Sequence, residues 1–209
     1  YDPLLMKVIA TGADRKQAIA RLDLALAQTR IDGIETNVAW LRSVLVHPDF
    51  VAGQPWTRLL DSHAPVLPGI DPLEPGTLST IQDWPGRSGY WDVGVPPSGP
   101  MDALAFRLCN RIVGNAEGTA GIEMTATGLA LAFNAQARIA LGGARMEGTL
   151  DGEPVSWWTP LTVRAGSRLR LGAISSPGQR SYLAIAGGLD VPEYLGSRAT
   201  FTLGRFGGH

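Results

Sequence analysis

The sequence has little cysteine, almost no net charge and no long apolar run. Cys109 is the single cysteine in 209 residues, which excludes an internal disulfide and indicates a reducing compartment. No apolar run approaches the length of a membrane span, and the start lacks the basic-then-apolar pattern of a signal peptide. The formal net charge is −1, and no basic block suggests nucleic acid or an anionic membrane surface. We therefore expect a cytoplasmic protein that binds neither a membrane nor nucleic acid.

Motifs for metals and nucleophiles are also missing. The histidines at 47, 63 and 209 have no metal-ligand spacing, so no metal site is expected. No phosphate-binding loop or serine nucleophile elbow occurs. Cys109 has no histidine near it in the sequence, and we expect a buried, inert thiol. Hydrophobic residues make up 44% of the chain, which is enough for a real core.

The first sixty residues are typical of an α/β unit. A short apolar strand is expected over residues 4–9, and Asp14 is a plausible N-cap for the helix that follows. Residues 31–34 form a tight turn or short strand, and Thr36 then caps a second helix. A last strand is expected over residues 57–60.

The best domain boundary follows, because residues 61–72 contain three prolines and no periodicity. The division is therefore residues 1–62, a linker over 63–72 and a β-rich domain over 73–209.

The β-rich domain begins with a strand over 73–82. Its one clear helix covers about 101–113, with a buried stripe of Leu104, Leu108 and Ile112 that ends at Gly114-Asn115. Further strands are expected over residues 129–133, 138–141, 145–150, 161–164, 168–171 and 182–186. Asp151-Gly152 signals a hairpin, and many short strands with one helix indicate a barrel or sandwich.

The segment over residues 83–102 is the most unusual part of the chain. Its prolines and glycines restrict or extend the backbone, and Trp84, Tyr90 and Trp91 must pack somewhere. A long ordered loop of this kind is more often a functional surface than a spacer.

Five motifs of the β-rich part resemble the carboxyltransferase domain of urea carboxylase, a family that also includes allophanate-hydrolase-subunit-2-like proteins and one component of 5-oxoprolinase. They are GTLSTIQD at 76–83, GVPPSGPMD at 94–102, NRIVGN at 110–115, GGLDVP at 187–192 and LGSRAT at 195–200.

The first part resembles the C-terminal end of a biotin carboxylase domain. The matching stretches are YDPLLMKVI at 1–9, RKQAIAR at 15–21 and IDGIETN at 31–37. This order of domains is similar to that of urea carboxylase and its close relative, guanidine carboxylase. The resemblance implies an α+β chain, in which a small α/β subdomain of an ATP-grasp carboxylase precedes an incomplete cyclophilin-like barrel. The chain begins at Tyr1 without an initiator methionine and ends in a glycine-rich stretch, and we therefore expect an internal fragment of a longer protein.

The resemblance also implies the chemistry. ATP, with Mg, and bicarbonate carboxylate biotin at one site. A biotin carboxyl carrier domain of the same polypeptide then brings the carboxyl group to urea or guanidine, and allophanate hydrolase acts downstream. The residues that bind ATP and Mg would lie mainly before Tyr1 and the biotin attachment segment after His209, so the fragment alone should be inactive. A hydrolytic component of 5-oxoprolinase and a regulatory binding module are the alternatives, and the carboxylase-like start argues against the first.

A urea or guanidine nitrogen is a poor nucleophile, so its site needs hydrogen-bond acceptors, a base and a dry pocket. Asp102 follows Ser98-Gly99-Pro100 at a helix start and is a candidate catalytic group, or it simply caps the helix. Asp83 is the second catalytic candidate. With Gln82 it could hold a urea-like substrate, and turn chemistry is the alternative.

The remaining candidates are binding residues. Ser98 and Gly99 border Asp102, and Tyr90 with its aromatic neighbours could form a wall for biotin or substrate, although loop aromatics more often anchor the loop. Arg198 could bind a carboxylate with two hydrogen bonds or form a structural salt bridge. The resemblance places Thr57 near the ATP adenine.

Overall fold

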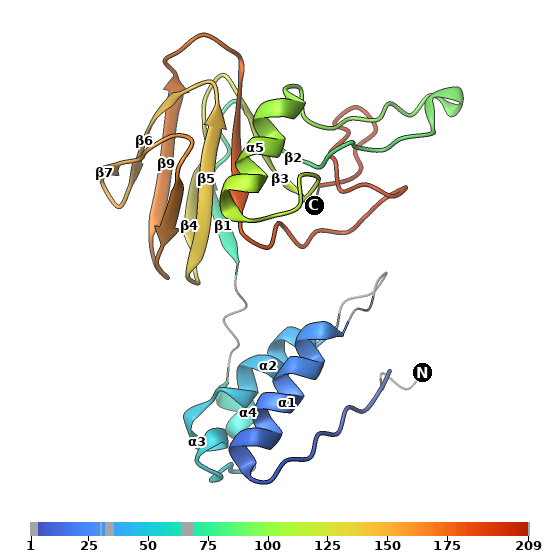
Figure 1. The fold of residues 1–209 in the computed structure, drawn as a ribbon, viewed down its shortest axis with the longest axis vertical. Helices are drawn as coiled ribbons and strands as arrows, with labels where there is room; N and C mark the ends of the chain where they lie inside the picture. The colour runs from blue at the N-terminus through green and yellow to red at the C-terminus, as the bar shows by residue number, and fades with distance from the viewer. Residues whose placement is uncertain (1–3, 30, 32–35, 64–68, 209) are drawn as a thin grey trace. The chain divides into compact units, whose positions relative to one another are not determined.

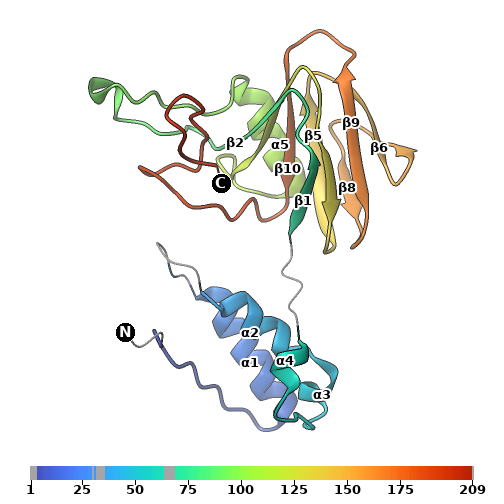
Figure 2. The ribbon, with the colours of Figure 1, turned by 180° about the vertical axis from the view of Figure 1, so that it is seen from behind.

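The computed structural model describes residues 4–29, 31, 36–63 and 69–208 (Figure 1). Contacts divide the chain into two compact units, Tyr1–Leu67 and Pro68–His209. Each unit has its own arrangement and is described by itself. Figure 2 shows the same elements from behind.

The first unit is helical in its described part. Its elements are α1 (Arg15–Gln28), α2 (Val38–Leu45), α3 (Pro48–Val51) and α4 (Leu59–Ser62). Asp14 caps α1 as predicted, because its carboxylate accepts the Gln17 N–H at 2.7 Å. The buried apolar side chains of the described residues in this unit are Leu26, Val44, Leu45 and Leu59.

Three predictions for this unit are wrong. Residues 4–9 form no strand, and most of their side chains are exposed; a strand needs a hydrogen-bonded partner, and no described strand pairs with them. The residue at the N-cap of α2 is Asn37 and not Thr36. Residues 57–60 are no strand, because Thr57 lies in a turn and α4 begins at Leu59. The turn predicted over 31–34 lies almost wholly outside the described residues.

The second unit contains two antiparallel five-stranded sheets. Sheet 1 has the order β1-β4-β9-β6-β7, and sheet 2 has the order β2-β3-β10-β5-β8. The strands are β1 (Ile70–Glu74), β2 (Leu78–Gln82), β3 (Gly121–Thr125), β4 (Ala130–Phe133), β5 (Ala137–Gly143), β6 (Met146–Leu150), β7 (Glu153–Pro154), β8 (Pro160–Val163), β9 (Arg168–Ile174) and β10 (Arg180–Ile185). The α+β class is confirmed, but no closed barrel is present among the described residues.

Side-chain alternation along the strands of sheet 2 creates two buried faces. On β3 and β10, Ile122, Met124, Leu183 and Ile185 join the core shared with sheet 1. Tyr182 and Ala184 point the other way and pack under α5 (Ala103–Val113). The helix therefore covers the outer face of sheet 2 (Figure 1).

All six of the shorter predicted strands are confirmed within one to three residues at their ends. The hairpin at Asp151-Gly152 is also confirmed: both residues have positive φ, 54° and 91°, and β6 pairs with β7 across them. The strand predicted over 73–82 is in fact two strands, because residues 75–77 break it. Residues 70–72, predicted as part of the linker, begin β1. The buried strand β3 has no counterpart among the predictions.

The predicted buried stripe of α5 is wrong for its two leucines, whereas Ile112 is partly buried and packs against the core under the helix. Leu104 is 65% exposed and Leu108 is exposed too, whereas Phe106 and Cys109 are buried. The sheet under the helix carries small residues, and a Cβ added to Gly142 would lie 2.4 Å from the Cys109 Sγ. Because the helix approaches the sheet so closely, its face with Phe106 and Cys109 packs against the sheet, and the two leucines point outward. The helix ends at Gly114 with a φ of 89°, as predicted.

Candidate functional site

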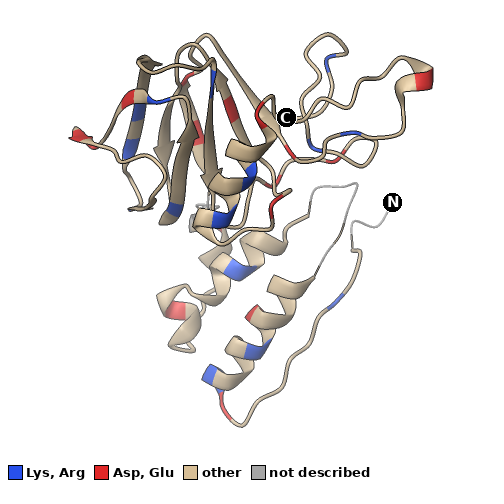
Figure 3. Cartoon of the chain, turned by 45° about the horizontal axis from the view of Figure 1, so that its top comes forward, with Lys and Arg blue, Asp and Glu red and all other residues tan. Residues whose placement is uncertain are grey.

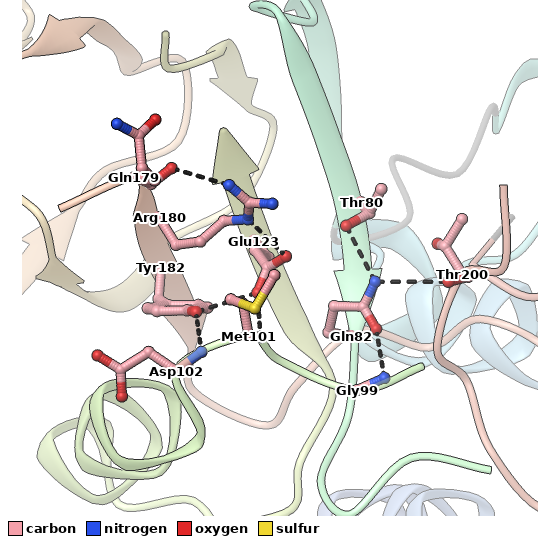
Figure 4. A network of polar contacts seen from close by, with 10 residues as sticks. All are labelled: Thr80, Gln82, Gly99, Met101, Asp102, Glu123, Gln179, Arg180, Tyr182 and Thr200. Carbon is pink, nitrogen blue, oxygen red and sulfur yellow. Dashed lines mark hydrogen bonds and ion pairs between the residues drawn. The ribbon is translucent and has the colours of Figure 1, made fainter. Parts of the chain in front are cut away.

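Residues 98–102, hereafter the anchored segment, are held by side chains from three neighbouring strands (Figure 4). The Gly99 N–H donates to Gln82 Oε1 of β2 at 2.9 Å. The Met101 N–H donates to Glu123 Oε2 of β3 at 2.7 Å, and the Asp102 N–H donates to the Tyr182 hydroxyl oxygen of β10 at 2.7 Å. Strands β2, β3 and β10 are adjacent in sheet 2, so the segment is tied across all three.

Glu123 is the charged centre of this network. Its side chain is buried, and Oε2 also accepts the Tyr182 O–H at 3.0 Å, while Oε1 lies 3.3 Å from Arg180 Nε. Burial and the neighbouring Glu123 raise the pKa of the Tyr182 hydroxyl, which therefore stays protonated and can donate. A buried carboxylate is tolerated only when it is hydrogen-bonded or paired, and Glu123 is both.

Asp102 is the N-cap of α5. Its Oδ1 accepts the Ala105 N–H at 3.0 Å, and the residue is exposed. The capping alternative from the sequence is thus realised in the geometry. Capping uses Oδ1, and the residue's exposure leaves the carboxylate accessible to a small molecule.

Gln82 and Asp83 use their polar groups within the protein. The Gln82 Nε2 donates to Thr80 Oγ1 at 3.0 Å while Oε1 accepts from Gly99. The two Asp83 oxygens accept from the Ser197 hydroxyl at 2.6 Å and from the Arg198 N–H at 2.7 Å. Both side chains join the loop around residues 197–200 to the end of β2.

The remaining binding candidates lie in several places. Arg198 donates to the Val191 carbonyl and pairs with Glu193 at 2.5 Å, so the structural salt bridge is the arrangement seen. Ser98 and Gly99 have positive φ, 55° and 82°, which turns the chain into the anchored segment. Tyr90 is half-buried and precedes η1 (Trp91–Val93), in the loop and apart from the strands that carry the network. The structure therefore brings Gln82 to Gly99 and Asp83 to Arg198, and it places Asp102 in the same short segment as Ser98 and Gly99.

Residues 83–97, hereafter the aromatic loop, leave the sheets and return to them, with η1 at the far end (Figure 1). Trp84 packs against α5, where the Arg107 guanidinium lies 4.3 Å from its ring centroid. Trp91 is 72% exposed. Packing therefore explains one of these two tryptophans.

The buried Arg87 joins this loop to the end of the chain. Its guanidinium donates to the carbonyls of Tyr194 at 2.8 Å and Ala199 at 2.9 Å, and it lies 4.9 Å from the Phe206 ring. The Arg87 backbone N–H also donates to the Pro97 carbonyl at 2.6 Å. This residue fixes the base of the loop.

The first unit offers one proposed contact, Thr57, which is exposed in a turn. Within residues 4–29, 31, 36–63 and 69–208, no three His, Cys, Asp or Glu side chains gather as metal ligands. None of the described helices is long and apolar enough to cross a bilayer. Acidic and basic residues are scattered over both units (Figure 3).

Four contributors to the site were missed from the sequence: Glu123, Tyr182, Arg180 and Arg87. Glu123 had a signal, because it is the one charged residue in the run Gly-Ile-Glu-Met-Thr over β3. A single charged residue in an otherwise uncharged strand indicates that its side chain has a polar partner on that face of the sheet. Arg87 had no signal in the sequence, since its partners are backbone carbonyls more than a hundred residues away.

Comparison with known proteins gives matches over both parts of the chain. The family described as "Carboxyltransferase domain, subdomain A and B" matches residues 93–209, and the "Biotin carboxylase C-terminal domain" matches residues 1–62. Urea amidolyase of Saccharomyces cerevisiae is 46% identical over the whole chain, which spans 11% of that protein's length.

Two further relatives are a solved structure and a bacterial protein. The crystal structure of Kluyveromyces lactis urea carboxylase has a TM-score of 0.74 and 42% identity, over 95% of this chain and 18% of that one. A component of the 5-oxoprolinase of Escherichia coli is 38% identical over 61% of the chain and 41% of its own length. Since the matching family model covers more than half of the residues, the chain belongs to the family of carboxyltransferase domains with subdomains A and B, joined here to a biotin carboxylase C-terminal domain as in urea amidolyases and urea carboxylases.

Proposed function

We propose that this chain is part of an ATP- and biotin-dependent urea carboxylase, a ligase that forms allophanate from urea in the cytoplasm. One observation carries the proposal: a biotin carboxylase end at residues 1–62 and a carboxyltransferase at 93–209 follow each other in one chain. The same order is matched over all 209 residues by urea amidolyase, whereas the 5-oxoprolinase component matches 128 residues. The carrier domain and the downstream allophanate hydrolase are the partners this function requires.

Asp102 is the proposed catalytic group. Urea presents N–H donors, and a carboxylate supplies the acceptor and the base that a weak nitrogen nucleophile needs. Its place at the N-cap of α5 fixes this carboxylate through the bond from the Ala105 N–H. Ser98 and Gly99 would border the substrate, and Gly99 would act through its carbonyl because its N–H is bonded to Gln82.

Asp83, Arg198 and Tyr90 have more distant proposed roles. Both oxygens of Asp83 accept hydrogen bonds from residues 197 and 198, so we assign it to holding Arg198 near the site. Arg198 would bind the carboxylate of a ligand only after its salt bridge with Glu193 breaks. Tyr90 would contact a ligand that reaches along the loop.

The cofactors fit this chain unequally. When bound, biotin supplies the activated carboxyl group, and its carboxylate needs hydrogen-bond donors. The N–H groups of Gly99, Met101 and Asp102 are all used within the protein, so the anchored segment fits the nitrogen substrate better than the carboxyl group. For ATP and Mg, the exposed Thr57 is the one contact proposed, and no described acidic cluster accompanies it.

The test is an assay of the full-length protein with ATP and bicarbonate. We expect ATP hydrolysis that requires urea and is blocked by avidin, which captures biotin. Stimulation by guanidine in place of urea would identify a guanidine carboxylase instead. Hydrolysis stimulated by 5-oxoproline and insensitive to avidin would overturn the proposal in favour of the hydrolase.

A further inference from the structure

We infer that Glu123 and Tyr182 are positioning residues that fix the catalytic carboxylate of Asp102 from beneath. This inference rests on the proposed function for its catalytic part, and on geometry alone for its positioning part. Neither residue is accessible to a substrate, because Tyr182 is 0% exposed and Glu123 is 8% exposed. Their polar atoms face the backbone of the anchored segment.

One ion pair and three hydrogen bonds connect these residues. Arg180 Nε lies 3.3 Å from Glu123 Oε1, and Glu123 Oε2 accepts from both the Tyr182 O–H and the Met101 N–H. The Tyr182 O–H donates to Glu123, and the Tyr182 oxygen accepts the Asp102 N–H. Because the Tyr182 oxygen accepts from Asp102, its own O–H is directed at the Glu123 carboxylate.

This network explains why the segment keeps an unfavourable backbone. Ser98 is not glycine, yet its φ is 55°, a region that costs about 1–2 kcal/mol for an L-residue. Two of the anchors, Glu123 and Tyr182, face each other directly across the β3–β10 pair. A rigid sheet thus sets the position at which Asp102 leaves the loop and starts α5.

Glutamine cannot replace Glu123 without a mismatch. With its oxygen toward Met101 and Tyr182, its amide NH₂ would face Arg180 Nε, donor against donor. With the amide reversed, the NH₂ would face the Met101 N–H. The first orientation of the isosteric Glu123→Gln change keeps the bonds to Met101 and Tyr182 but loses the ion pair with Arg180. The second orientation breaks the Met101 bond.

Tyr182→Phe removes only the hydroxyl and keeps the ring, which packs edge-on against Phe106 at 5.8 Å. Tyr194→Phe is the matched control, since it makes the same chemical change at a half-exposed ring that contacts Phe206. Amide hydrogen exchange tests the positioning part in the full-length protein without any substrate. We expect exchange at Met101 and Asp102 to be about 10-fold faster in Tyr182→Phe than in Tyr194→Phe.

Turnover tests the catalytic part. In Tyr182→Phe we expect kcat for the urea-dependent reaction to fall about 10- to 100-fold with KM changed less than about 3-fold, because displacement of a catalytic group acts on the transition state. Carboxylation of free biotin, measured without urea, should stay at the wild-type rate. In an Asp102→Asn background the Tyr182→Phe change should have no further effect, since it acts through Asp102.

The outcomes separate the two claims. Unchanged exchange at Met101 and Asp102 overturns the positioning inference, whatever the substrate proves to be. Faster exchange with unchanged kcat, or additive effects of Asp102→Asn and Tyr182→Phe, overturns the catalytic link. A wild-type enzyme that ignores urea instead refutes the proposed function and leaves the exchange result standing.

Discussion

Two buried charges in this chain are stabilised in different ways. Glu123 accepts two hydrogen bonds and faces a cation, Arg180. Arg87 is 1% exposed, and its described partners are backbone carbonyls and an aromatic ring. A guanidinium presents five donors in a fixed plane, and this geometry suits several carbonyls on one loop better than a lysine would. Single residues therefore hold together segments that are far apart in the sequence.

Arg87→Met should destabilise the second unit strongly. The change leaves the buried carbonyl of Ala199 and the part-buried carbonyl of Tyr194 without their donor, so we expect a loss of about 2–4 kcal/mol in the free energy of unfolding. Chemical denaturation of the chain measures it. Arg145→Met, at an exposed position, is the control and should change stability by less than about 0.5 kcal/mol. Equal losses in the two variants would contradict the assigned role.

Cys109 should resist thiol reagents in the native protein. The side chain is fully buried, and burial raises its pKa to about 12, with a smaller contribution from Asp102. Since the folded pKa exceeds the unfolded value near 9, the neutral thiol favours folding at neutral pH, and this contribution is lost as the pH rises from about 9 toward 12. At pH 8 we expect labelling by Ellman's reagent only at the rate of unfolding, and immediate labelling in denaturant. Fast labelling of the native protein would refute the buried position.

At the scale of elements, the sequence predicted what local patterns determine. The α5 boundaries and the turn at Asp151-Gly152 depend on capping and on positive φ, and both are confirmed. The face that α5 buries depends instead on the sheet beneath it, where Gly142 admits a close helix, and no pattern within the helix reports this. The same limit applies to the site: Asp102 and Gln82 lie in recognisable motifs, but Glu123 and Tyr182 acquire their roles only when β3 and β10 pair.

The two faces of α5 can be distinguished by alanine substitution. Phe106→Ala should cost about 3–5 kcal/mol, because it removes a fully buried ring that packs against Tyr182. Leu104→Ala should cost less than about 0.5 kcal/mol, since that side chain is mostly exposed. The leucine stripe expected from the sequence requires the reverse order. Urea denaturation of the two variants of this chain decides between them.

At the scale of the whole molecule, the apolar core is distributed unevenly. The described residues of Tyr1–Leu67 bury only Leu26, Val44, Leu45 and Leu59, and many of the unit's large apolar side chains are exposed. The unit Pro68–His209 has two packed sheets and a covering helix, which is the layered arrangement of an independent domain. Its core is continuous across both sheets.

Deletion of residues 1–67 should therefore leave the main thermal transition of the chain in place. The stability of a small unit scales with its buried apolar area, and the described residues of the first unit bury too few apolar side chains for a cooperative transition of their own. We expect the chain over 68–209 to melt within about 3 °C of the full 209 residues, a difference that corresponds to less than ~1 kcal/mol for a domain of this size. Scanning calorimetry of both chains gives the comparison. The complementary chain over 1–67 should unfold gradually with heating. Loss of the sharp transition on deletion would mean that the first unit completes the core of the second.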